Sequence, residues 1–196
     1  MFKGLWMNIM DLDASKMLDK FTGFFTMISG DHRYTHEGLG YTYCGKTGNL
    51  ADLASAESFQ FTTPPSPTGN ERIVHLRPPS VASVASAVEI RLAEGSTVTG
   101  GTAATAINKK RSKPDASLCV LKTGVTLSAE GLVIAQGIAG SSGAAQSVQG
   151  GSAGAVADKE IILKAATTYT LTIANLTATD TVAYYELDWY EEKQGG

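Results

Sequence analysis

Apolar and polar residues alternate along much of the chain beyond residue 56, which is the pattern of β-strands that bury one face. Phe59 and Phe61 alternate with polar residues, and so do Val88, Ile90 and Leu92 farther along. With a further short strand near the N-terminal end, the pattern predicts strands at residues 40–44, 58–62, 73–76, 88–93, 117–122, 131–136, 159–164, 168–174 and 182–191.

Each early run ends in residues that break regular structure, namely TPPSPTGN at 63–70, RPPS at 77–80 and EGSTVTGG at 94–101. Many short strands with such turns and no long helical pattern predict an all-β fold, a jelly-roll-like antiparallel β-sandwich, and disfavour a parallel α/β fold. The Gly-, Ser- and Ala-rich stretch 137–155 is expected to be a long flexible loop between two strands. A linker to another domain is the alternative, but too little chain follows to build a second core.

Residues 1–36 differ from the rest because large apolar side chains gather there with few turn residues between them. The stretch that follows Asp13 predicts a short helix with that aspartate as its N-cap. We therefore divide the chain into an N-terminal arm, 1–36, and a β-sandwich, 37–196. The arm either packs under its own domain or docks on a partner. Its expected anchors are Phe2, Leu5, Trp6 and Ile9.

The last predicted strand has two unlike faces. Tyr185, Leu187 and Trp189 point to one side and are expected in the core, whereas the side with Tyr184 and Tyr190 meets water or a neighbouring molecule. Tyr184 and Tyr190 are therefore candidate interface residues. The acidic pair that follows, Glu191 and Glu192, is expected to be a solvated strand end and not an acid/base pair.

A formal net charge of -3 gives no electrostatic case for binding nucleic acid or an anionic membrane, and no apolar run is long enough to span a bilayer. One basic run is the exception. It is either a solvated loop or a contact with an acidic partner, and its candidate residues are Lys109, Lys110 and Arg111. The two cysteines, Cys44 and Cys119, are interpreted as reduced cytosolic thiols, although the sequence neither requires nor excludes a disulfide.

Residues 40–47, GYTYCGKT, match the G-x-x-x-x-G-K-[ST] pattern of phosphate-binding loops. Such a loop follows a buried parallel strand and opens a helix, whereas the residues before Gly40 contain no buried strand. The Tyr-Thr-Tyr alternation indicates a short strand at 40–44 followed by a turn. Nucleotide binding is therefore a remote alternative.

Other candidate chemistry is sparse. His32 and His36 have the i, i+4 spacing of zinc ligands on a helix, but Gly30 and Gly38 favour a loop and only Glu37 suggests a third ligand. His75 is expected to be a surface residue of its strand. No nucleophilic triad is evident, so we expect neither an enzyme nor a cofactor or metal.

The C-terminal segment resembles a group of tailed-bacteriophage virion proteins. In these a Leu-Lys, Thr-x-Tyr and Thr-Asn stretch leads to a terminal Glu-x-x-Trp-Tyr-Glu strand. The matching residues here are Leu163-Lys164, Thr167 to Tyr169, Asn175 and Glu186 to Glu191. Upstream pieces follow in the expected order: HEGLGY (36–41), TTPP (62–65), VHL (74–76), EIRLAEGSTVTGGT (89–102) and NKKRS (108–112). The resemblance covers residue 36 to the end and does not include the arm.

The resemblance implies a capsid decoration, or cement, protein. Such a protein is a β-sandwich that binds the outside of the major capsid protein lattice as a homodimer or homotrimer, with no cofactor and no reaction. It is made in the host cytoplasm and resides on the outer surface of the virion. Because many copies bind symmetric sites, a small binding energy per copy accumulates over the head. The alternative is a carbohydrate- or receptor-binding accessory module of a head fibre or tail, which would bind its ligand on loop tips.

Overall fold

The computed structural model describes residues 30–65, 72–112, 115–140, 149–152 and 160–193. The chain divides into two compact units, Met1–Arg33 and Tyr34–Gly196, and every described strand belongs to the second. The four expected anchors of the arm and the helix predicted after Asp13 lie outside the described residues. The fold below is therefore that of the second unit, with helix α2 (Gly30–Glu37) at its start.

The first sheet is built around the last strand of the chain, β13 (Ala183–Lys193). Its main path runs β10-β4-β13-β1-β7, and β3 pairs with both β13 and β11. The remaining strands of this sheet are β1 (Gly40–Lys46), β3 (Arg72–Leu76), β4 (Ser80–Ser83), β7 (Ile107–Asn108), β10 (Gln149–Ser152) and β11 (Ile161–Leu163). β13 thus hydrogen-bonds to three strands that come from far earlier in the sequence.

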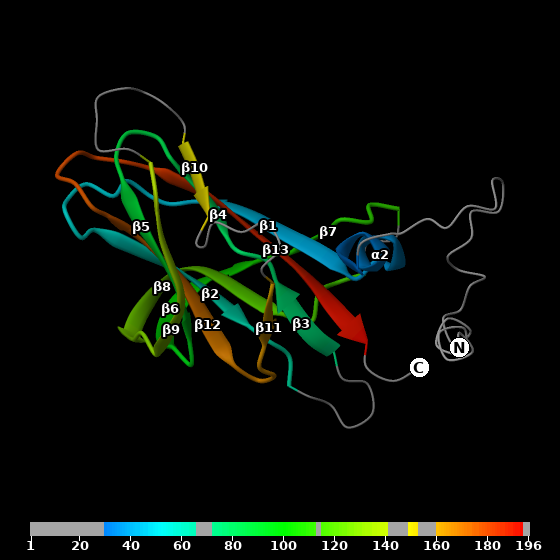
Figure 1. The fold of residues 1–196 in the computed structure, drawn as a ribbon. Helices are drawn as coiled ribbons and strands as arrows, with labels where there is room; N and C mark the ends of the chain where they lie inside the picture. The colour runs from blue at the N-terminus through cyan, green and yellow to red at the C-terminus, as the bar shows by residue number, and fades with distance from the viewer. Residues whose placement is uncertain (1–29, 66–71, 113–114, 141–148, 153–159, 194–196) are drawn as a thin grey trace, which may run out of the picture. The chain divides into compact units, whose positions relative to one another are not determined.

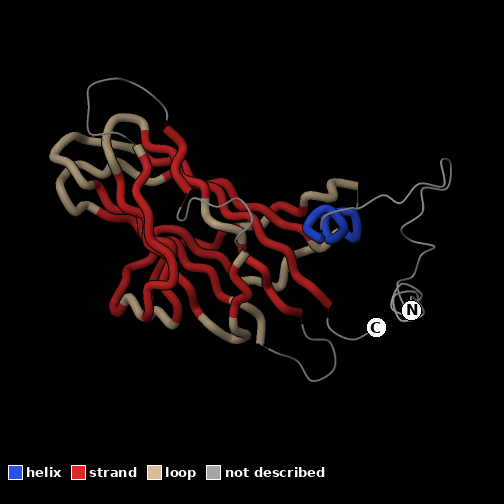
Figure 2. Tube along the Cα trace, in the orientation of Figure 1, coloured by secondary structure: helices blue, strands red, loops and turns tan. Residues whose placement is uncertain are grey.

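The second sheet has six strands in the order β6-β8-β2-β12-β5-β9, with β12 near its centre. Its strands are β2 (Ala56–Thr62), β5 (Val88–Glu94), β6 (Thr97–Ala104), β8 (Val120–Ala129), β9 (Leu132–Ala139) and β12 (Thr168–Asn175). Strands account for nearly all regular structure (Figures 1 and 2). The predicted all-β antiparallel sandwich is confirmed, whereas the jelly-roll connectivity stays a prediction.

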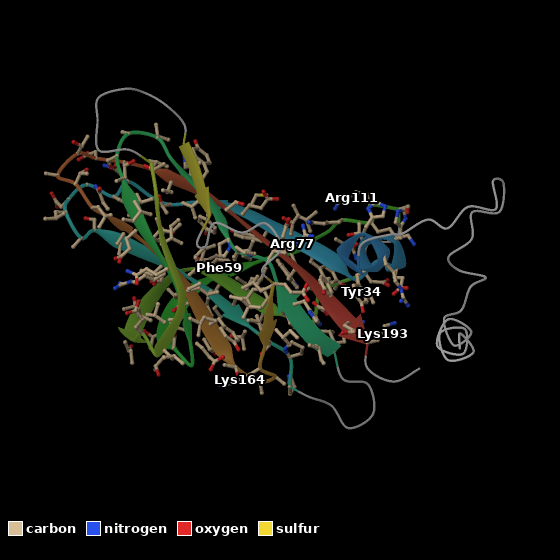
Figure 3. All side chains as sticks on the ribbon, in the orientation of Figure 1. Tyr34, Phe59, Arg77, Arg111, Lys164 and Lys193 are labelled. Carbon is tan, nitrogen blue, oxygen red and sulfur yellow. The ribbon has the colours of Figure 1, made fainter. Side chains whose placement is uncertain are left out.

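Aromatic side chains from both sheets fill the space between them. The Trp189 ring of β13 meets Phe61 of β2 edge to face, with ring centroids 5.1 Å apart. Phe59 stacks on Tyr43 of β1 at 5.0 Å and is labelled in Figure 3. The alternation in the sequence therefore marks the core correctly, since Phe59, Phe61 and Trp189 are all buried.

Several elements differ from their predictions. β4 begins at the last residue of a predicted turn and continues through residues for which no strand was predicted. Most of β6 occupies a stretch that was expected to be a turn, and β10 lies inside the predicted flexible loop. These strands are rich in Ser, Thr, Gly and Ala, so backbone pairing with a neighbour defines them and apolar alternation does not. Helix α2 replaces the loop expected around His32 and His36.

The GYTYCGKT segment is the extended strand β1 and the residue that follows it, so it is not a phosphate-binding loop. Its two glycines allow close packing. A Cβ atom at Gly40 would lie 2.7 Å from Thr35 Oγ1, and one at Gly45 would lie 2.5 Å from the hydroxyl oxygen of Tyr185. Both glycines of the pattern thus lie where a side chain would come too close to a neighbouring residue.

Candidate functional site

Five polar and aromatic side chains from four segments meet on the outer face of the first sheet. They are Tyr34 of α2, His75 of β3, Glu160 just before β11, and Tyr190 and Glu192 of β13, and we call them the Tyr190 cluster. His75 is the direct cross-strand partner of Tyr190, so the two side chains stand side by side on the same face of the sheet. Figure 3 shows Tyr34 close to the C-terminal part of β13.

Three rings of the Tyr190 cluster form a stack with Tyr190 in the middle. Its ring lies 4.5 Å from that of Tyr34 and 4.4 Å from the imidazole of His75, with interplanar angles of 11° and 12°. Offset stacking of this kind adds about 0.5–1.5 kcal/mol per pair beyond the burial of area. The stack fastens the end of α2 to the sheet.

The two carboxylates of the Tyr190 cluster each accept a hydrogen bond from a tyrosine hydroxyl and face one nitrogen of His75. Tyr190 donates to Glu160 (2.7 Å), whose other oxygen lies 3.0 Å from His75 Nδ1. Tyr34 donates to Glu192 (2.7 Å), whose other oxygen lies 3.1 Å from His75 Nε2. These contacts form one continuous chain from Tyr190 through Glu160, His75 and Glu192 to Tyr34.

Burial shapes the electrostatics of Tyr190. Desolvation, followed by the hydrogen bond to Glu160 and the charges around it, raises the pKa of Tyr190, so the phenol stays protonated and acts as a donor. His75 is only 6% exposed, so its expectation as a surface residue is wrong. The tyrosine on one side and the two glutamates remove it from solvent.

Glu191, expected to be solvated, is fully buried between the sheets. Its carboxylate pairs with Arg72 at 2.8 Å and accepts bonds from the Ser117 hydroxyl and the Leu118 amide. Burial and this negative charge raise the pKa of the nearby Cys119 thiol, so that cysteine stays protonated. The glutamate is a structural ion-pair partner, and the expectation of a solvated strand end is wrong for this residue.

The basic run is largely engaged within the chain. Lys109 forms an ion pair with Asp188 at 2.8 Å, and Lys110 donates to the backbone carbonyl of His36. Arg111 is exposed (Figure 3). Of the three basic interface candidates, only the arginine is exposed.

The two tyrosine candidates of β13 lie in different surroundings. Tyr190 is 7% exposed, because the other members of the Tyr190 cluster cover it, whereas Tyr184 is 52% exposed. Beside Tyr184 lies a hollow of about 300 Å³ lined by residues of three neighbouring strands: Cys44, Gly45, Ser80, Val81, Ala82, Tyr184, Tyr185 and Glu186. Cys44 is exposed there as a free thiol.

A separate exposed apolar surface lies on β9, an edge strand of the second sheet. Leu132 and Ile138 are 65% and 64% exposed, and Val133 is 37% exposed. No charged residue occurs from residue 131 to residue 157. This edge lacks the charges with which edge strands commonly discourage pairing with other chains.

Asn175 organises the loops at one end of the sandwich. Its fully buried side chain donates to the carbonyls of Leu50 and Thr179 and accepts a bond from Ser86. Although Asn175-Leu176-Thr177 has the form of a glycosylation sequon, this amide is not accessible in the folded chain. The residue has a structural role.

A metal site finds no support among the described residues, which contain no group of three histidine, cysteine or carboxylate side chains suited to a metal ion. His32 and His36 do lie one turn apart on α2, but no third ligand joins them there. Within the same residues, no helix is long and apolar enough to cross a membrane.

Sequence reasoning missed the Tyr190 cluster because its members are 158 positions apart at the extremes. Periodicity places β3, β11 and β13 but does not show which polar residues of these strands become neighbours. One sequence feature indicated a part of the cluster, namely the two-residue alternation that places Tyr190 and Glu192 on one face of β13.

Comparison with known proteins yields no relative. No protein-family model, no curated protein and no solved structure matches the chain.

Proposed function

We propose that the chain is a structural protein of a bacteriophage virion, which decorates the outside of the head and stabilises the expanded shell without catalysing a reaction. The observation that carries the proposal is the exposed apolar edge of β9, with Leu132, Val133 and Ile138 on a strand without charge. An uncharged edge of this kind suits burial against another subunit.

The fold and the sequence pattern support the same function. An antiparallel sandwich with large aromatic residues between its sheets is a rigid body that transmits load between its neighbours on a shell. The resemblance of the segment from residue 36 onward to phage virion proteins points to the major capsid protein as the partner. We further propose that the decorating unit is a homodimer or homotrimer.

The proposal is tested by adding purified protein to expanded phage heads that lack it and measuring co-sedimentation. Replacing Ile138 with Lys is expected to reduce occupancy at least tenfold, because a desolvated charge in an apolar interface costs more than about 1.4 kcal/mol. The matched control is Ile162→Lys on β11, since Ile162 is 62% exposed and Ile138 is 64% exposed. Equal binding of both variants would contradict the assignment of β9, and absence of the protein from purified virions would contradict the function.

The arm is tested separately. Deleting residues 1–12 removes the four expected anchors Phe2, Leu5, Trp6 and Ile9. If the arm contacts the capsid or a sister subunit, head occupancy falls while the thermal unfolding of the sandwich stays unchanged. Unchanged occupancy would remove the arm from the proposal and leave the role of β9 standing.

The hollow beside Tyr184 favours a second candidate function, binding of a carbohydrate by a virion accessory module. A half-exposed aromatic ring lies there next to a carboxylate, Glu186, and a hydroxyl, Ser80, which is the mixture of apolar and polar groups that small-ligand sites use. Titration of soluble oligosaccharides into the protein tests it, with Tyr184→Ala as the variant. Binding that the variant retains would exclude this hollow.

A further inference from the structure

We propose that the outer face of the first sheet around Tyr184 is a self-complementary interface, which binds the same face of a second copy of this chain about a twofold axis. The inference deepens the proposed function, because it rests on the proposal of a homo-oligomer and selects the homodimer. It uses a surface other than the edge of β9, so one copy can contact its sister and a capsid protein at the same time.

Six residues of three paired strands share this part of the sheet. We call them the Tyr184 face: Cys44 and Lys46 of β1, Ser80 and Ala82 of β4, and Tyr184 and Glu186 of β13. The three strands run side by side (Figure 1), and cross-strand partners point to the same side of a sheet. All of these residues except Ala82 are exposed, so the Tyr184 face is open surface of the described chain.

An aromatic ring and a hollow adjoin on the Tyr184 face. The Tyr184 side chain is 52% exposed, and the hollow of about 300 Å³ beside it is lined largely by small residues, among them Gly45, Ser80 and Ala82. Exposed tyrosines next to a depression are typical anchors of protein interfaces, because the ring of one molecule fills the depression of the other. The face thus offers both the projecting part and the recess that such a contact needs.

Two charged side chains of the Tyr184 face have no ionic partner of their own. Among the described residues, neither Lys46 nor Glu186 forms an ion pair. Glu186 accepts a hydrogen bond of 3.3 Å from the Thr42 hydroxyl. One cation and one anion are therefore available to a partner molecule.

The positions of these charges are reciprocal. Lys46 is the cross-strand partner of Tyr184, and Cys44 is that of Glu186, so the four residues form the corners of a rectangle. Lys46 and Glu186 occupy one diagonal of it. A twofold axis along the other diagonal exchanges them, so that Lys46 of each copy faces Glu186 of the other. A second copy of the chain therefore fits the charge pattern of the face.

The size of the rectangle agrees with this arrangement. Its sides measure about 4.8 Å across the strands and about 6.7 Å along them, so the exchanged positions coincide within about 3 Å, a distance that lysine and glutamate side chains span. Tyr184 and Cys44 lie on the axis, and each meets its counterpart of the other copy. The two tyrosine rings can lie offset, each over the hollow of the other copy.

The aromatic and charged parts of the interface have different roles. Burial of the two rings supplies most of the affinity, whereas ion pairs at an exposed rim add little. The ion pairs select the partner and its orientation, because like charges in their place repel each other. We therefore expect a dimer that weakens as salt screens these pairs.

Sedimentation equilibrium of the full chain, without phage heads, tests the interface. The wild type is expected to form a dimer that dissociates on dilution, with a larger Kd at about 0.5 M than at about 0.05 M NaCl. Tyr184→Ala and Glu186→Lys should each raise this Kd at least about tenfold, the first by loss of the anchor and the second by repulsion from Lys46. Lys193→Glu, a charge reversal at the exposed end of β13, is the control and should change the Kd less than about twofold.

A charge exchange identifies the two residues as partners. Glu186→Lys sets two lysines against each other and Lys46→Glu sets two glutamates against each other, so each single reversal should weaken the dimer. The double variant restores opposite charges in both pairs, and its Kd should return to within about threefold of the wild-type value. A merely structural role of either residue would not produce this recovery.

Cys44 gives an independent measurement, because it lies on the proposed axis and is exposed, whereas Cys119 is buried. A short bismaleimide should link Cys44 of one copy to Cys44 of the other in the wild type and in the double variant. The same reagent should give little linked product with Glu186→Lys.

The possible results separate the interface from the proposed function. A protein that is monomeric at all concentrations overturns the interface and leaves the hollow to the carbohydrate candidate. A dimer that none of these variants weakens, or a double variant without recovery, overturns it as well. A dimer that shows the expected variant effects but does not bind heads supports the interface and contradicts the proposed function, whereas head binding by a monomeric wild type does the reverse.

Discussion

A substitution at Gly45 tests whether close packing requires the glycines of GYTYCGKT. In a Gly45→Ala variant the new Cβ would lie 2.5 Å from the hydroxyl oxygen and 2.7 Å from Cε2 of Tyr185. Ordinary carbon contacts are about 3.5–4.0 Å, so one of the groups has to move by about 1 Å. Tyr185 is 5% exposed and packs against Tyr43 and Phe59, with ring centroids 6.1 and 5.8 Å away. These two aromatic neighbours limit the movement of the Tyr185 ring, although the residue also lines the hollow beside Tyr184.

Overpacking of this kind costs about 1–3 kcal/mol. The loss of chain entropy in the unfolded state favours Ala over Gly by about 0.4–1 kcal/mol, which offsets a part of that cost. We expect a net loss of about 1–2 kcal/mol in the free energy of unfolding. For a domain of this size such a loss lowers the Tm by about 2–8 °C.

The assay is urea unfolding followed by tryptophan fluorescence, with Gly48→Ala as the matched control. A Cβ at Gly48 would have its nearest contact at 3.5 Å, with Glu57, which is an ordinary distance. The control is expected to change stability by less than about 1 kcal/mol. Lys46→Ala, at an exposed position of the same segment, should likewise leave folding and head binding nearly unchanged.

A double-mutant cycle identifies the contact. Adding Tyr185→Leu to Gly45→Ala removes the ring that the new methyl group meets. The losses in the free energy of unfolding of the two single variants, added together, should therefore exceed the loss of the double variant by at least about 0.5 kcal/mol. If Gly45→Ala is as stable as Gly48→Ala, or if the two changes are additive, the packing explanation is wrong.

The remaining predictions concern buried polar groups and the two thiols. Replacing Glu191 with Ala leaves Arg72 without its buried partner and should destabilise the fold by about 3–5 kcal/mol in denaturant unfolding. Native alkylation should modify Cys44, which is exposed, and spare the buried Cys119 until denaturant is added; equal rates would contradict the burial. Asn175→Ala removes a fully buried amide that joins three loops and should cost about 2–4 kcal/mol, measured as a shift of the urea midpoint.

Strands with large apolar side chains could be predicted from the sequence. Phe59, Ile90 and Leu187 alternate with polar neighbours, and all three are buried as expected. β6 could not be found in this way, because its residues are mostly exposed and its threonines, alanines and glycines carry no apolar pattern. Its position depends on hydrogen bonds to β8, which a local pattern does not reveal.

At the site, the sequence-based prediction failed mainly for polar residues that are buried. Local sequence places Glu191 at a strand end and His75 on a polar face, yet both are buried because charged or aromatic partners come from other strands. A charged side chain is buried where a partner compensates its lost hydration, and that partner is fixed only by the tertiary fold. Conversely, Tyr184 is exposed as the alternation predicts, since nothing described in the structure covers it.

The place of β13 has a consequence for synthesis of the protein. The C-terminal strand is the centre of the first sheet, and its partners include β1, more than a hundred residues earlier. β13 is translated after all of its partner strands, so the nascent chain exposes one face of its aromatic core until β13 has left the ribosome. A chain that ends before residue 183 cannot close its first sheet, which leaves such truncated products open to proteolysis.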